Sequence, residues 1–196
     1  MEQVVAREIL MNLNQLDARS RLFEIIQRKS FVRGDIVLAS GRRSDHYFDL
    51  KPTMLDTEGA ELIAQLIVRC LQNVQVDFVG GLALGAVPLL SPVAIESRKI
   101  GKPVSGLIVR QAAKDHGTRK LIEGADDLTG KRVVVVDDVT TTGASAMYAV
   151  NILRQAGAKI TLVVSVVDRQ EGAAEFYAKE GIPFRSLFVS QDFVEH

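Results

Sequence analysis

Two adjacent carboxylates, Asp137 and Asp138, directly follow a run of four valines. The valine run (133–136) predicts a buried strand, and the hydroxyl-rich residues 139–145 predict a loop that opens a helix. N–H groups at a helix N-terminus bind phosphate, and a glycine such as Gly143 lets the backbone approach it closely. Carboxylates suit hydroxyl groups or a hydrated divalent cation. The segment therefore predicts a ligand with a phosphate and a diol, such as a ribose 5-phosphate.

Cationic side chains form a second feature. Residues 110–123 hold four basic and two acidic residues, and residues 110–127 lack sustained periodicity, as is typical of a lid or binding loop. Such a loop can close over a dense negative charge such as pyrophosphate, stabilise it and exclude water. Arg169 follows another predicted buried strand, and its guanidinium can hold a carboxylate through two hydrogen bonds.

Each feature also has a purely structural explanation. Asp138 and the threonines could only cap a helix, residues 110–123 could be a solvated charge run, and Arg169 could be an ordinary surface arginine. Two successive acids after a buried strand favour the binding interpretation of the first feature. The other two gain weight because they accompany it in one chain.

Alternating strands and helices must position these side chains. The predicted helices cover 13–29, 61–71, 87–97, 144–155 and 173–179, and the predicted strands cover 36–39, 47–50, 77–79, 104–109, 133–136, 160–167 and 184–189. Asp56 and Thr57 are good caps for the second helix, and residues 40–45 predict a turn. Continuous apolar strands between helices predict an α/β fold with a mostly parallel sheet, which binds ligands beyond the carboxyl ends of its strands.

The length predicts a single domain over residues 1–196, in which a small N-terminal subdomain (about 1–50) precedes an α/β core (about 51–196). The 24 basic and 24 acidic residues give no basic excess, which disfavours nucleic-acid binding and is compatible with self-association. Cys70 is the single cysteine, so a reduced, cytoplasmic compartment is expected. Residues 80–95 are too short and interrupted to span a membrane, the N-terminus lacks the apolar core of a signal peptide, and the three histidines lack metal-ligand spacing.

Residues 133–145 resemble the phosphoribosyl pyrophosphate (PRPP) signature of the type I phosphoribosyltransferases. The chain from about residue 31 onward is similar to the orotate phosphoribosyltransferases within that superfamily. The segments that carry this similarity occur in the family's order and spacing: Ser40-Gly41-Arg42-Arg43-Ser44, Tyr47-Phe48-Asp49-Leu50, Arg110, Lys114-Asp115-His116-Gly117, Ile122-Glu123-Gly124 and Asp168-Arg169-Gln170-Glu171.

The resemblance implies a type I phosphoribosyltransferase fold with an N-terminal hood, and it implies roles for particular residues. Asp137 and Asp138 would bind the ribose hydroxyls. The 5-phosphate would lie against Val139, Thr140, Thr141, Thr142, Gly143, Ala144 and Ser145. Arg110, Lys114 and His116 would contact the pyrophosphate, with Lys114, His116 and Asp138 as the catalytic residues. Orotate would be held by Thr141, Arg169, Tyr47 and Phe48, the last two through their backbone.

The same resemblance implies a Mg²⁺-dependent enzyme of pyrimidine (UMP) biosynthesis that makes orotidine 5′-monophosphate. The Mg²⁺ would be held through PRPP and water, without direct protein ligands. The substrates would be PRPP and orotate, and the enzyme would be a homodimer whose loop reaches into the neighbouring active site.

Three positions depart from the family pattern. Ala39 replaces a frequent lysine, Gln111 replaces a frequent basic residue, and Leu84 lies in a segment that often contains a tyrosine. These departures leave two alternatives open. One is a phosphoribosyltransferase for another base, such as a purine, and the other is a PRPP-binding regulator without catalysis.

Overall fold

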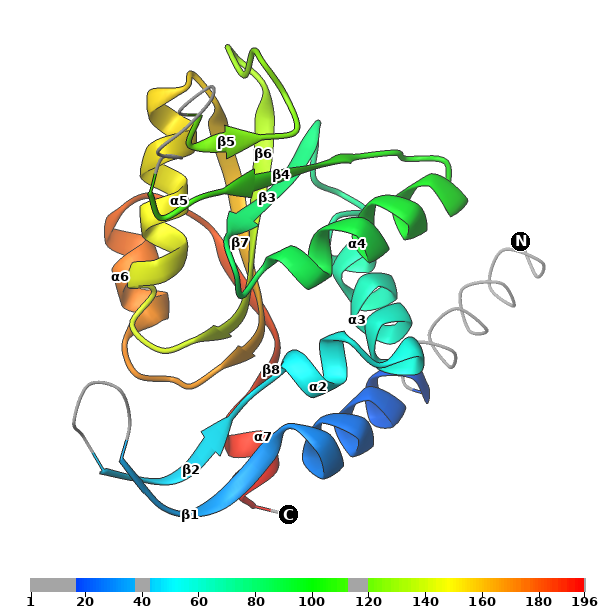
Figure 1. Ribbon diagram of the computed structural model, residues 1–196, viewed down its shortest axis with the longest axis vertical. Coiled ribbons are helices and arrows are strands. Elements are labelled where there is room, and N and C mark those ends of the chain that lie inside the picture. The colour runs from blue at the N-terminus through cyan, green and yellow to red at the C-terminus, as the bar shows by residue number, and fades with distance from the viewer. Residues whose placement is uncertain (1–16, 38–42, 113–119, 196) are drawn as a thin grey trace, which may run out of the picture.

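Two β-sheets organise the chain in a computed structural model that describes residues 17–37, 43–112 and 120–195 (Figure 1). The larger sheet has the strand order β5-β4-β3-β6-β7-β8, and among the described strands β4 and β5 form its only antiparallel pair. Its strands are β3 (Phe78–Leu82), β4 (Ser105–Val109), β5 (Ile122–Glu123), β6 (Arg132–Thr140), β7 (Lys159–Asp168) and β8 (Phe184–Val189). The expected α/β architecture with a mostly parallel sheet is confirmed.

Helices cover both faces of this sheet (Figure 1). One face packs against α3 (Thr57–Cys70) and α4 (Val87–Lys99), and the other against α5 (Ala144–Gln155) and α6 (Ala173–Lys179). Side chains alternate along a strand, so Val134 and Val136 enter the first core while Val133 and Val135 enter the second. This burial on both sides explains why the strand reads as a continuous valine run.

The strand order creates a switch point between β3 and β6. The chain runs from β3 outward to β4 and then returns to the other side of β3 to form β6. Loops that leave β3 and β6 therefore diverge to opposite faces, which opens a crevice at the carboxyl ends of these strands. Asp137 and Asp138 lie at the carboxyl end of β6. The fold thus places the paired acids where an open α/β sheet binds its ligand.

The second sheet is the antiparallel hairpin of β1 (Phe31–Val37) and β2 (Arg43–Phe48). It lies beyond the edge of the large sheet at which β6 and β7 end (Figure 1). Phe48 packs 5.0 Å from Phe31 and 5.3 Å from Phe193, measured between ring centroids. Phe193 belongs to α7 (Gln191–Val194), and the N-terminal helix (described for 17–29) adds Phe23, whose ring stacks on Phe193 at 4.6 Å. We call this hairpin the hood.

Several element boundaries differ from the sequence prediction. β1 begins at residue 31 rather than 36, because a bulge between Arg33 and Ile36 interrupts the alternation that a strand pattern requires. β2 begins at Arg43, inside the predicted turn, and ends at Phe48 rather than at residue 50. A short α2 (Lys51–Met54), α7 and β5 were not predicted, since four residues or fewer carry almost no periodicity. The part of the predicted first helix that precedes residue 17 lies outside the described residues.

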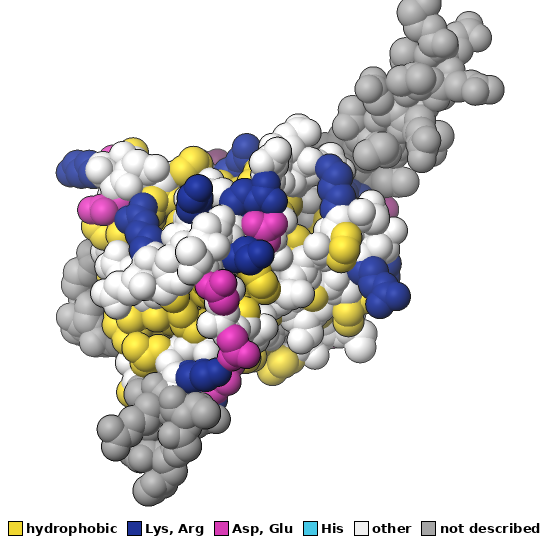
Figure 2. All heavy atoms as spheres, turned by 90° about the horizontal axis from the view of Figure 1, so that it is seen from above, with side chains coloured by type: hydrophobic (Ala, Val, Ile, Leu, Met, Phe, Trp, Pro, Cys, Tyr) yellow, Lys and Arg dark blue, Asp and Glu magenta, His cyan; other side chains and the backbone are white. Residues whose placement is uncertain are grey.

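Charged side chains of both signs lie among one another on the face seen in Figure 2. This agrees with the equal numbers of basic and acidic residues in the sequence. Across residues 17–37, 43–112 and 120–195, no helix combines the length and the apolar character that crossing a bilayer requires.

Candidate active site

Asp137 and Asp138 are the last acids of β6 and differ in their surroundings. Both lie within the strand, whereas the sequence prediction placed them just after it. Asp137 is 6% exposed, and its Oδ2 accepts a hydrogen bond from Thr140 Oγ1 at 3.0 Å. Burial and, next, the charge of Asp138 raise the pKa of Asp137 to about 7. Asp138 is half-buried, so it is the more accessible of the two acids to a ligand.

The loop that follows β6 leads directly into the N-terminus of α5. Gly143 is the N-cap of this helix with φ +87°, a left-handed conformation that glycine adopts without strain. Within the described residues no side chain caps the helix, so its first N–H groups remain available to a phosphate. Thr142, Ala144 and Ser145 are exposed and Thr141 is half-buried. The side chains of Val139 and Thr140 point into the protein, which leaves their backbone as the part that a ligand could touch.

Tyr177 packs against this loop from the protein interior and was not identified from the sequence. Its ring is fully buried, and its hydroxyl donates a hydrogen bond to Gly143 O at 3.0 Å. A Cβ on Gly143 would lie 2.9 Å from Tyr177 Cζ, so only glycine fits against the ring. Burial raises the pKa of the Tyr177 hydroxyl. The only sequence signal was an aromatic residue in an otherwise ordinary helix, which says nothing of a partner 34 residues away.

The loop between β3 and α4 approaches the second acid. A Cβ on Gly85 would lie 2.9 Å from Asp138 Oδ1. Leu84, one of the departures from the family pattern, is 74% exposed beside it. The peptide between Ala83 and Leu84 is cis. The structure therefore brings this loop to Asp138, although its residues supply backbone rather than charged groups.

Arg169 lies directly after β7, next to the acids. Its N–H donates to Thr140 O at 2.8 Å, and its own carbonyl accepts from Ser190 Oγ at 3.2 Å. The side chain is 6% exposed, with Nε 3.0 Å from Glu171 Oε1 and Nη2 donating to Ser44 Oγ at 3.1 Å. Among the described residues, Nε forms this ion pair with Glu171 but no hydrogen bond. A buried guanidinium with donors to spare is suited to an anionic ligand.

The hood adds the other predicted base-binding residues. Phe48 is 3% exposed and belongs to the core, so only its backbone could border a ligand. Tyr47 is 40% exposed.

Lys51 was not identified from the sequence: its hydrogen bond to Asp49 Oδ1 (3.0 Å) raises its pKa, and the charge of Asp138 adds to this effect. Lys51 therefore lies within electrostatic reach of the paired acids.

Arg110 is held at the base of the predicted lid. It follows β4, two strands away from β6, and its Nε donates to Glu123 Oε1 at 3.1 Å. Arg110 N donates to Leu121 O at 2.8 Å, which closes the base of the segment, and Tyr148 Oη donates to Gln111 O at 2.9 Å. Lys114 and His116 lie outside the described residues, as does Ala39. The predicted roles of Lys114 and His116 therefore stay predictions.

The described residues contain no group of three or more His, Cys, Asp or Glu side chains that could hold a metal ion. The paired acids could still hold a hydrated cation through water.

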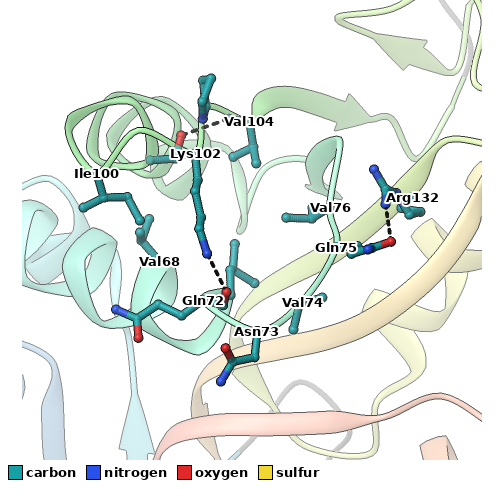
Figure 3. Close-up of a pocket in the computed structure, with 13 residues that line it drawn as sticks. Val68, Gln72, Asn73, Val74, Gln75, Val76, Ile100, Lys102, Val104 and Arg132 are labelled. Atoms are coloured by element: carbon teal, nitrogen blue, oxygen red, sulfur yellow. Dashed lines mark hydrogen bonds between the residues drawn. The ribbon is translucent and has the colours of Figure 1, made fainter.

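A separate hollow of about 550 Å³ lies at the opposite, amino ends of the strands (Figure 3). There Lys102 Nζ donates to Gln72 O at 2.7 Å, and Arg132 pairs with Asp77 and Gln75. None of the predicted site residues lines this hollow.

Known proteins are similar to this chain in sequence. The family model described as "Phosphoribosyl transferase domain" matches residues 53–186. The orotate phosphoribosyltransferase of a Bradyrhizobium species is 52% identical over 180 residues, which cover 90% of this chain and 97% of that protein. The orotate phosphoribosyltransferase of a Synechocystis species is 44% identical over 174 residues, which cover 89% of this chain and 87% of that protein.

Solved structures give the same picture. Orotate phosphoribosyltransferase from Mycobacterium tuberculosis, in a complex with PRPP, superposes with a TM-score of 0.76 at 36% identity and covers 90% of this chain and 99% of that chain. Adenine phosphoribosyltransferase from Leishmania donovani superposes with a TM-score of 0.66 at 16% identity, covers 87% of this chain and 80% of that chain, and shares the fold alone.

Proposed function

The chain belongs to the orotate phosphoribosyltransferase family, and on this basis we propose that it transfers the phosphoribosyl group of PRPP to orotate. The products are orotidine 5′-monophosphate and pyrophosphate, in pyrimidine biosynthesis. The observation that carries the proposal is the meeting of three parts at one sheet edge: paired acids, a helix start that no described side chain caps, and a buried arginine. These parts fit a sugar, a phosphate and a carboxylate in turn.

The PRPP half of the site uses the end of β6 and the start of α5. Asp137 and Asp138 accept hydrogen bonds from the ribose hydroxyls, and the backbone of residues 139–145 holds the 5-phosphate. Arg110, Lys114 and His116 contact the pyrophosphate from the segment that β4 and β5 bracket. Positive charge placed there stabilises the leaving group as its charge develops.

The orotate half of the site uses Arg169 and the hood. Arg169 holds the carboxylate, Thr141 and the backbone of Tyr47 and Phe48 border the ring, and this fixes N1 toward C1 of the ribose. The new bond joins orotate N1 to C1 while the bond from C1 to the pyrophosphate oxygen breaks. The transition state resembles an oxocarbenium ion, and the protein contributes positioning and electrostatics.

Mg²⁺ fits this site as part of the substrate complex. The half-buried carboxylate of Asp138 suits a cation that PRPP and water carry in. When bound, Mg²⁺ supplies charge neutralisation of the pyrophosphate.

We further propose a homodimer with shared active sites in the cytoplasm. Family membership supports the dimer, and the lone cysteine supports a reduced compartment. Cys70 is partly buried on α3, and burial raises the pKa of its thiol, as expected for an unreactive core position.

The test is a base panel. Purified protein is mixed with Mg²⁺ and PRPP, and the loss of orotate absorbance is followed, with guanine, hypoxanthine and uracil read by product chromatography. The proposal expects PRPP- and Mg²⁺-dependent loss of orotate and little product from the other bases. Turnover of a purine instead would show a changed base pocket around Leu84 and Gln111. PRPP binding without any turnover would identify a regulator.

A further inference from the structure

Ser44 joins the hood to the sheet edge at the place where orotate would bind. It lies on β2, 125 residues before Arg169, and its Oγ accepts the 3.1 Å hydrogen bond from Arg169 Nη2. We infer that Ser44 is a positioning residue that sets the specificity for orotate by orienting Arg169. This inference rests on the function proposed above, in which Arg169 holds the orotate carboxylate.

Two hydrogen bonds to the backbone of His46 orient the hydroxyl of Ser44. It donates its proton to His46 O at 2.8 Å, and the backbone N–H of His46 points back to the same oxygen at 3.4 Å. With its single proton committed to the hairpin, the oxygen presents a lone pair to Arg169. Ser44 therefore acts toward the guanidinium as an acceptor.

This arrangement decides which edge of Arg169 remains for a ligand. A guanidinium carries five N–H donors in a rigid fork. The contact with Ser44 uses one hydrogen of Nη2, and Glu171 lies beside Nε. Within the described residues, Nη1 takes part in no hydrogen bond. Nη1 and the second hydrogen of Nη2 therefore remain as donors for the oxygens of a carboxylate.

Ser44 also connects the two elements that would recognise orotate. The carbonyl of His46, which accepts the Ser44 proton, belongs to the peptide that precedes Tyr47. A single hydroxyl thus links Arg169, at the end of β7, to the hood backbone that would border the ring. Without the Ser44 hydroxyl, the Arg169 guanidinium would still pair with Glu171 but would lose the hydrogen bond that orients it toward the proposed orotate site.

The experiment compares Ser44→Ala, Ser44→Thr and Arg43→Ala in the full-length protein. Ser44→Ala removes one charge-assisted hydrogen bond and should raise the KM for orotate about tenfold, while the KM for PRPP stays within about twofold. Ser44→Thr keeps the hydroxyl and should restore most of the orotate KM. Arg43 is the matched control, because it is the neighbouring hood residue, is largely exposed and pairs with Asp35 rather than with Arg169. Its loss should leave the orotate KM within about twofold.

Two further variants, Arg169→Ala and the double variant Ser44→Ala/Arg169→Ala, distinguish a failure of this inference from a failure of the proposed function. If Ser44 acts through Arg169, adding Ser44→Ala to Arg169→Ala should raise the orotate KM no further. Additive effects would overturn the inference, as would an unchanged orotate KM in Ser44→Ala when Arg169→Ala raises it. An equal effect of Arg43→Ala would show that general loosening of the hood is responsible. An unchanged orotate KM in Arg169→Ala would instead remove the proposed role of Arg169 itself.

Discussion

Replacing Asp137 by asparagine tests whether this buried carboxyl makes the stability of the fold depend on pH. The ordinary pKa of this carboxyl, 3.8, is raised to about 7 in the folded protein by burial and by the charge of Asp138. The folded state therefore holds a proton more tightly than the unfolded state. The stabilisation from this proton is fully present below pH 4 and is lost as the pH rises through about 7.

The magnitude follows from the interval between the two pKa values. Each tenfold fall in proton concentration within that interval removes about 1.36 kcal/mol of stability. From pH 5 to the folded pKa of about 7 there are two such steps, so Asp137 should lower the free energy of unfolding by about 2.5 kcal/mol between pH 5 and pH 8. An asparagine at this position does not titrate, and its amide oxygen can still accept from Thr140 Oγ1.

The assay is urea unfolding at pH 5 and pH 8 for the wild type, Asp137→Asn and Asp126→Asn. All groups other than residue 137 are common to the wild type and Asp137→Asn and cancel in the comparison. Asp126 pairs with Lys120, which lowers its pKa, so its titration is complete below pH 5 and it serves as the matched control. Asp137→Asn should abolish about 2.5 kcal/mol of the pH dependence. A wild-type pH dependence of stability in Asp137→Asn would show that Asp137 is not the group that titrates.

Three further substitutions test the PRPP half of the site. Gly143→Ala adds a Cβ against the Tyr177 ring at φ +87°, so it should lower the free energy of unfolding by about 2–4 kcal/mol in the same urea assay. Gly85→Ala places its Cβ 2.9 Å from Asp138 Oδ1. Because that carboxylate can turn aside, stability should change little while kcat/KM for PRPP falls about 10- to 100-fold in steady-state kinetics. Lys114→Ala should lower kcat by about 100-fold in initial-rate assays, and an unchanged kcat would remove its catalytic role.

Much of the core architecture was predictable because its sequence signals are local. The valine run buried on both faces marks β6, and α5, α6 and β8 begin and end where their periodicity predicts. Asp56 caps α3 by accepting from Gly59 N at 3.0 Å, as the capping pattern predicted. These elements agree because local preference and tertiary packing favour the same structure.

The hood and the supports of the site were harder to predict because they depend on distant contacts. The bulge in β1 and the early start of β2 become evident only once the two strands are paired. Tyr177 and Lys51 reach the candidate site from elements that carry no motif, and the bond between Ser44 and Arg169 joins positions 125 residues apart. Sequence spacing predicts which residues end a strand, but not which side chain from another element meets them.

Recognition of the orotate carboxylate by Arg169 is the claim on which the assignment of the base depends, and one measurement tests it directly. The kcat/KM values for orotate and for uracil, which lacks the carboxylate, are determined with saturating PRPP and Mg²⁺ in the wild type and in Arg169→Ala. We predict that the wild type prefers orotate at least about 100-fold and that Arg169→Ala loses this preference through a fall in the kcat/KM for orotate alone. An undiminished preference for orotate in Arg169→Ala would contradict it.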